Sequence, residues 1–139
     1  MKESEKKEAR HWLAVLTRLY EQNEVAIRDT ANLDTESSPQ DWDKAFSNVN
    51  VRALISAIHA VKELPKPKQK ELRKLQQCYT DLVSACIKAG HLYLKAYYDK
   101  HLGRIDYHKM IFCTSIAKGL FKDFSRDLDK VRQEIEVSK

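Results

Sequence analysis

The last part of the chain carries the most regular pattern in the sequence. Apolar residues recur there every three or four positions over more than three heptads, which places them on one face of an α-helix. The members of this stripe are Met110, Cys113, Ala117, Leu120, Phe121, Phe124, Leu128, Val131 and Ile135. A helix with one long apolar face buries it against other elements, so the rest of the chain has to supply packing partners.

Two other stretches show the same spacing and predict further long helices. The first runs from about Ser4 to Thr30. The other follows Pro65 and Pro67, which force a turn, and continues to about Leu102. Asp106 is placed to cap the last helix.

The stretch between these two helices is less regular. Ser38 and Pro39 predict a helix start, because serine caps a helix and proline fits its first position. A second apolar series begins at Val51 and is offset from the first. We therefore expect either one kinked helix ending at Leu64 or two short helices that meet near residues 48–50.

These patterns together predict the fold class. Short connections make neighbouring helices antiparallel, so we expect an all-α, up-down bundle of four long helices, the second kinked or split in two. The 139 residues suit a single domain that spans residues 1–139. Only three glycines are present, too few for the ordered glycine loops that bind nucleotide phosphates.

The ends and the cysteines bear on location. The first residues are charged and lack the apolar segment of a secretory signal, and no window approaches the roughly 20 apolar residues of a membrane span. The three cysteines, Cys78, Cys86 and Cys113, lie in apolar helical sequence, where cysteine behaves as a small hydrophobe. We expect a cytoplasmic protein with no membrane partner.

Positive charge is concentrated in the second half of the chain. Residues 1–65 carry nine Lys+Arg and eleven Asp+Glu, whereas residues 66–139 carry sixteen and nine. Residues 62–74, which we call the basic turn, hold six basic side chains and two acidic ones. Lysine and arginine on a rigid element displace counterions from phosphates, so the basic turn is a candidate nucleic-acid contact. Its basic members are Lys62, Lys66, Lys68, Lys70, Arg73 and Lys74.

A second candidate contact lies near the turn between the last two helices. Tyr98, Arg104 and Tyr107 combine aromatic rings, which stack on unpaired bases, with a cation. This turn and the basic turn should lie at opposite ends of one long helix, roughly 45 to 50 Å apart at 1.5 Å per residue. Only an extended polymer or a larger assembly would contact both.

Residues 29–43, the acidic segment, suggest a different function. They hold five acidic side chains and no basic one. The acidic segment could dock on the basic turn of the same chain or of another copy, because opposite charges favour such a contact. The protein would then be a protein–protein scaffold or a self-assembling homo-oligomer that does not bind nucleic acid.

Arg52 and His59 lie seven residues apart on a predicted helix, so they project from nearly the same side. This Arg-x6-His resembles the R-x4-6-H motif of HEPN-type ribonucleases, in which the two residues act together on an RNA phosphodiester. The resemblance covers this motif and the helical architecture, and it implies a metal-independent ribonuclease. Ala53 departs from the polar residue that the family tends to have at that position. Because His59 adjoins the apolar face of its helix, a packed structural histidine is the favoured interpretation.

No motif for a cofactor or a metal is present. Glu8 and His11 have the E-x-x-H spacing of di-iron carboxylate bundles, but the sequence lacks the second copy that such a site requires. The cysteines form no C-x2-C pair. We expect neither a metal nor a cofactor.

Of all the features in the sequence, the basic turn gives the strongest indication of function. We expect a non-catalytic, basic helical protein, a small subunit or adaptor of a larger complex that contacts the backbone of RNA or DNA. The scaffold and the HEPN-like ribonuclease are the alternatives.

Overall fold

A computed structural model describes residues 2–99 and 104–137, with the side chains of residues 2–95 and 106–135. Within these ranges the chain forms helices and no strand, so the all-α prediction is confirmed. The helices are α1 (Glu3–Ala31), α2 (Pro39–Ala45), α3 (Asn48–Glu63), α4 (Lys70–Asp99) and α5 (Arg104–Val137). Over the described residues the chain has three long helices, and the second segment is split in two, which is one of the two expected outcomes, with seven residues in α2 and sixteen in α3.

Hydrogen bonds at the junction explain why the second segment is split. Ser47 caps α3 by accepting a hydrogen bond from the backbone N–H of Asn50 at 3.3 Å. The buried Asn50 amide donates to the carbonyls of Lys44 and Ala45, both at 3.1 Å, and so satisfies the end of α2. Asn50 also donates to Asp29 of α1 at 3.4 Å. One asparagine thus ends α2 and ties the junction to α1.

Of the two predicted helix caps, the one at Ser38 is confirmed and the one at Asp106 is not. Ser38 caps α2 as expected, accepting from the Asp41 N–H at 3.2 Å while its own N–H donates to the Asp41 carboxylate at 2.9 Å. The cap predicted for the last helix is wrong. Arg104 already lies in α5, so Asp106 falls in the first turn of α5, where its charge favours the helix dipole.

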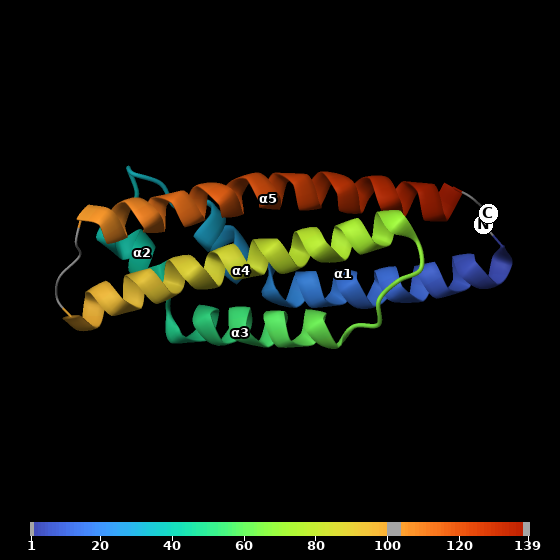
Figure 1. The fold of residues 1–139 in the computed structure, drawn as a ribbon, viewed down its shortest axis with the longest axis horizontal. Coiled ribbons are helices and arrows are strands. Elements are labelled where there is room, and N and C mark those ends of the chain that lie inside the picture. Colours follow the sequence, from blue (N-terminus) through green and yellow to red (C-terminus); the bar gives the residue numbers. More distant parts are fainter. Residues whose placement is uncertain (1, 100–103, 138–139) are drawn as a thin grey trace.

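The arrangement of the helices places the basic turn and α2 toward opposite ends of the molecule. Figure 1 shows α4 and α5 lying side by side, and α1 packs against α3, α4 and α5. The start of α1, the turn between α3 and α4 and the end of α5 lie together at one end, whereas α2 lies toward the other. The basic turn and the acidic segment are therefore far apart.

The main core lies between α1, α3, α4 and α5. Its centre is aromatic: the Phe124 ring lies 5.0 Å from the ring of Tyr20 and 5.2 Å from the ring of Tyr79, centroid to centroid. Tyr79 and Phe124 are fully buried. Asn23, the polar residue in the α1 stripe, is buried as well, and its amide donates to the Leu19 carbonyl at 2.8 Å.

A smaller core joins α2 to α4 and α5. Trp42 of α2 stacks on Tyr93 of α4 with the ring centroids 6.2 Å apart, and Phe46 packs against both rings. Gly90 makes room for Phe46, because a Cβ added at Gly90 would lie 3.1 Å from that ring. The Phe46 ring therefore fills the space that the missing side chain of Gly90 leaves on α4.

No helix among the described residues is both long enough and apolar enough to cross a membrane.

Candidate nucleic-acid interface at the basic turn

The basic turn connects two helices at one end of the molecule. Lys62 lies in the last turn of α3, Lys66 and Lys68 lie in the connection, and three more basic residues lie at the start of α4. All six side chains are exposed. Among the residues that the structure describes, none of the six forms an ion pair. The turn therefore presents positive charge that no ion pair within this part of the chain neutralises. The residues at the start of α4 are Lys70, Arg73 and Lys74.

Two side chains of α4 hold the connection in place. Arg73 donates from Nη1 to the carbonyl oxygens of Pro67 at 3.3 Å and of Lys68 at 2.6 Å. Gln76 donates from Nε2 to the Val61 carbonyl at 3.2 Å, which ties the end of α3 to α4. Arg73 thus stabilises the connection, whereas the charges of the lysines remain available to a partner.

A depression of about 270 Å³ gathers three of the cations. Lys62, Lys66 and Arg73 border it, and the side chains of Gln76, Gln77 and Thr80 add polar groups on α4. The three polar side chains already donate within the chain, to the Val61 carbonyl, the Asp81 carboxylate and the Gln76 carbonyl. The cations are therefore the groups around this depression that suit phosphate oxygens. The run of charge in the sequence predicts the cations, but the contribution of the three polar residues depends on the helical geometry of α4.

A larger groove of about 370 Å³ lies where the connection packs beside α1. Its apolar lining comes from Trp12 and Val15 of α1 together with Leu64, Pro65 and Pro67. The buried indole Nε1 of Trp12 has no hydrogen-bond partner within the described residues. The polar rim of the groove consists of Glu8, His11, Lys66, Lys68 and Gln69. Sequence reasoning missed this groove because it arises only where α1 packs beside the basic turn.

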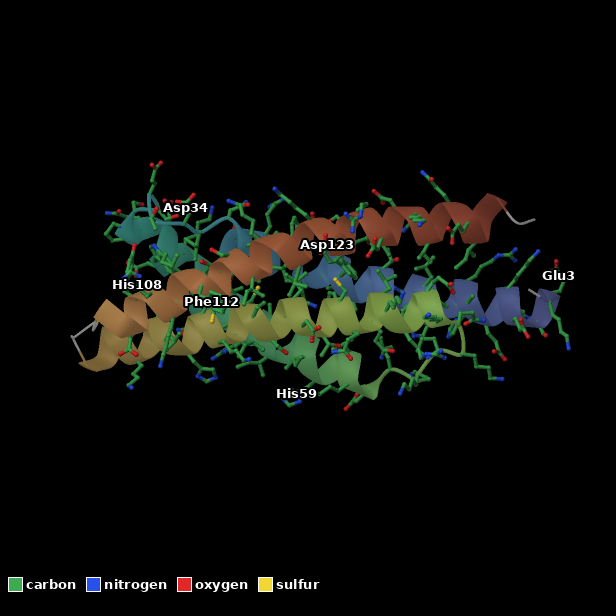
Figure 2. All side chains as sticks on the ribbon, turned by 45° about the horizontal axis from the view of Figure 1, so that its top comes forward. Glu3, Asp34, His59, His108, Phe112 and Asp123 are labelled. Atoms are coloured by element: carbon green, nitrogen blue, oxygen red, sulfur yellow. The ribbon has the colours of Figure 1, made fainter. Side chains whose placement is uncertain are left out.

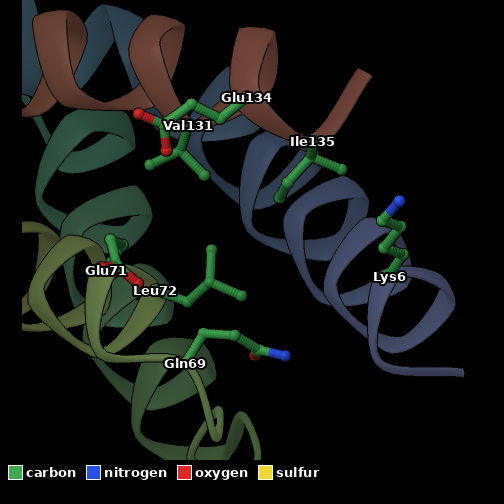
Figure 3. A pocket seen from close by; sticks show the side chains of 7 residues that line it. All are labelled: Lys6, Gln69, Glu71, Leu72, Val131, Glu134 and Ile135. Carbon is green, nitrogen blue, oxygen red and sulfur yellow. The ribbon is translucent and has the colours of Figure 1, made fainter. Parts of the chain in front are cut away.

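A third depression of about 200 Å³ marks the edge of the basic surface. Figure 3 shows side chains from α1, α4 and α5 around it. Glu71 and Glu134 contribute carboxylates there, and Lys6 is the single lysine in its lining. Carboxylates repel phosphate, so this depression is a poorer match for a nucleic-acid backbone than the one that Lys62, Lys66 and Arg73 border.

The second predicted contact surface is only partly described. The side chains of Tyr98 and Arg104 lie outside the described residues. Tyr107 is half-buried and packs against the smaller core, with its ring centroid 6.1 Å from that of His108. Tyr107 therefore has a packing role, and the 30 residues of α4, about 45 Å of helix, separate this region from the basic turn.

The acidic segment does not dock on the basic turn of its own chain. The two lie toward opposite ends of the molecule (Figure 1), and α3 alone, with sixteen residues, spans about 24 Å between them. Most carboxylates of the acidic segment accept hydrogen bonds from other groups of the chain. Asp34 accepts from the N–H of Glu36 at 2.9 Å, Asp41 belongs to the α2 cap, and Asp43 accepts from the Tyr93 hydroxyl.

Arg52 and His59 are both exposed on α3. Figure 2 shows His59 on the outer side of this helix. Within the described residues neither side chain makes a hydrogen bond or an ion pair. The expectation that His59 is a packed structural histidine is therefore wrong, and the pair stands open to solvent without a group to orient it.

The cysteine environments are unsuited to nucleophilic chemistry. Burial raises the pKa of the Cys78 thiol to about 11, with nearby Asp123 adding to the effect. Burial also raises the pKa of Cys86 to about 12. Because the thiolate is the reactive form, both residues are protonated and inert near neutral pH. The described residues contain no group of three or more His, Cys, Asp and Glu side chains that could hold a metal ion.

No protein-family model, curated protein or solved structure matches the chain.

Proposed function

We propose that the protein contacts nucleic-acid phosphates through the basic turn and acts without catalysis, as a small cytoplasmic subunit or adaptor of a larger RNA- or DNA-containing complex. One observation carries this proposal. The basic turn carries six exposed cations, internal hydrogen bonds hold its connection in place, and no carboxylate within the described residues pairs with these cations. Phosphate contacts release counterions, and a connection whose backbone is already held in place loses little backbone entropy when it binds.

The position of the charge supports this interpretation. Lys70, Arg73 and Lys74 lie in or next to the first turn of α4, where positive charge opposes the helix dipole. Each exposed charge at such a place costs a few tenths of a kcal/mol. A chain that keeps three of them there gives up some stability, which is expected where a partner uses the charge.

The helical scaffold suits this role. We propose that α1, α3, α4 and α5 form an up-down bundle, with α2 as an addition to the connection between α1 and α3. The short connection over residues 64–69 supports this arrangement, because short loops join antiparallel neighbours. Such a scaffold would hold the basic turn at one end, away from the acidic segment.

The proposal is tested by titrating labelled single-stranded and duplex nucleic acid with the wild-type protein at about 50 and 200 mM salt. We expect binding at the lower salt concentration and an affinity about a thousandfold weaker at the higher one, as for roughly six phosphate contacts. The absence of binding at the lower concentration would contradict the proposal. It would favour the scaffold, whose partner is a protein.

A metal-independent ribonuclease remains a second candidate, because Arg52 and His59 are exposed on the same helix and seven residues apart. RNA incubated with the protein in the presence of EDTA would be shortened if this candidate is right. His59→Ala would then stop the cleavage while the far-ultraviolet circular dichroism stays unchanged. Intact RNA would leave the non-catalytic proposal in place.

A further inference from the structure

The outer face of α5 carries apolar side chains that none of the described residues covers. Phe112 is 65% exposed and Ile116 is 41% exposed, and they lie one helical turn apart. Figure 2 shows Phe112 between His108 and Asp123 along α5. A phenylalanine at this exposure loses the free energy that burial would provide, about 25 cal/mol for each Å² of apolar surface.

Gly119 continues the same face and has no packing reason within the chain. It is exposed, and a Cβ added to it would meet no atom within 4 Å. Glycine inside an exposed helix costs about 1 kcal/mol relative to alanine. Its one structural advantage here is that a neighbouring molecule can approach the α5 backbone closely.

The spacing of this face matches a seam between two helices. Phe112, Ile116, Gly119 and Asp123 follow one another at intervals of four, three and four residues. The pairs Phe112–Gly119 and His108–Asp123 share one midpoint, between residues 115 and 116. A twofold axis at that midpoint would therefore place each large residue opposite a small one and each histidine opposite a carboxylate.

We propose that two copies of this chain associate through their α5 helices, antiparallel about a twofold axis between residues 115 and 116. The Phe112 ring of each copy fills the space over Gly119 of the other copy, and His108 lies beside Asp123. Each contact occurs twice, as in any isologous interface. Two matches favour a second copy of the chain over an unrelated apolar partner: the large side chain opposite a glycine, and the His108 imidazole opposite the Asp123 carboxylate, which also pairs with Arg126 of its own helix at 3.3 Å.

The same register sets limits on the strength of the dimer. Lys109 faces Lys122 on its flank, which is a like-charge pair. One pair of helices also covers less surface than the roughly 1,200 to 2,000 Å² of a stable interface. We therefore expect a dimer that dissociates at micromolar concentration. The basic turns lie at the two far ends of this dimer, so the proposal is independent of nucleic-acid binding.

Sedimentation equilibrium of the wild-type protein from about 1 to 300 µM tests the proposal, with the mass expected to rise from one chain to two. Gly119→Gln is the decisive variant. It should raise the midpoint of thermal unfolding, because glutamine favours helix, and yet weaken dimerisation at least tenfold, because its side chain occupies the place of Phe112. A substitution that acted only through the stability of the fold would not raise the unfolding midpoint and weaken dimerisation at the same time.

Two further variants make the test specific. Phe112→Ser should also weaken the dimer at least tenfold. Val25→Ser removes an apolar side chain of similar exposure, 55%, from α1 and should leave the mass unchanged. A wild-type protein that stays monomeric over the whole range, or a dimer that Gly119→Gln does not weaken, would overturn the proposal.

Discussion

Replacing Lys66, Lys68 and Lys70 together by glutamate is expected to weaken nucleic-acid binding at about 50 mM salt by at least a hundredfold. The variant removes three phosphate contacts and places three negative charges in the same positions. All three side chains are exposed and none has an ion pair within the described residues, so the fold should tolerate the change. Fluorescence anisotropy of a short labelled oligonucleotide measures the affinity.

A matched variant separates the position of the charge from its amount. Lys88, Lys95 and Lys118 are exposed on α4 and α5, away from the basic turn, and their replacement by glutamate changes the net charge equally. We expect an affinity within a few-fold of wild type for this control. Equal losses in the two variants would show that binding follows overall charge, which would contradict a site at the basic turn.

Raising the pH from 8 to 11 is expected to lower the free energy of unfolding substantially. Burial raises the pKa of Cys86 to about 12 and of Cys78 to about 11, and it raises the pKa values of Tyr79 and Tyr20 as well. Each folded pKa lies above its unfolded value, so the stabilisation is complete below about pH 9 and is lost as the pH rises through the folded values. For Cys86 alone the loss by pH 11 is on the order of 2 kcal/mol.

Urea unfolding followed by circular dichroism at pH 8, 9, 10 and 11 gives this dependence. Cys86→Ala serves as the control, because it lacks the titrating thiol. It should be less stable than wild type at pH 8 and lose less stability between pH 9 and 11. A wild-type protein whose stability is flat over this range would show that the thiol and the phenols are not buried as described.

The sequence predicted the long helices well, because their pattern is local. The predicted first helix, Ser4 to Thr30, differs by one residue at each end from α1. Six of the nine residues in the α5 stripe are buried, and Cys113, Leu120 and Phe121 are half-buried. The division into α2 and α3 depends on Asn50, whose amide reaches Asp29 of α1 and the end of α2. Contacts over that distance leave no periodic signal, which is why the sequence allowed two outcomes.

The candidate site was predictable only where it rests on charge. The six cations form a visible run, and lysines are seldom buried, so their exposure follows from their type. The groove beside Trp12 requires α1 to pack against the connection, and the exposure of His59 requires the exact rotation of α3. Neither follows from spacing alone.

The acidic segment shows the opposite difficulty. Its charge suggested a docking surface, but Asp34, Asp41 and Asp43 accept hydrogen bonds from nearby groups and organise the connection into α2. Carboxylates commonly cap helices and close turns, so a run of them in a loop has a local use. Composition alone does not distinguish that use from a binding surface.

The most direct test of the central claim is the slope of log affinity against log salt concentration for duplex DNA, measured for wild type and for Lys66→Ala. Lys66 borders both the groove beside α1 and the depression beside Arg73, so its ammonium is central to the proposed contact. If it binds a phosphate, the slope should become shallower by about 0.9 when the lysine is removed. A steep slope that stays the same in Lys66→Ala would place the bound phosphates elsewhere on the molecule and contradict the account.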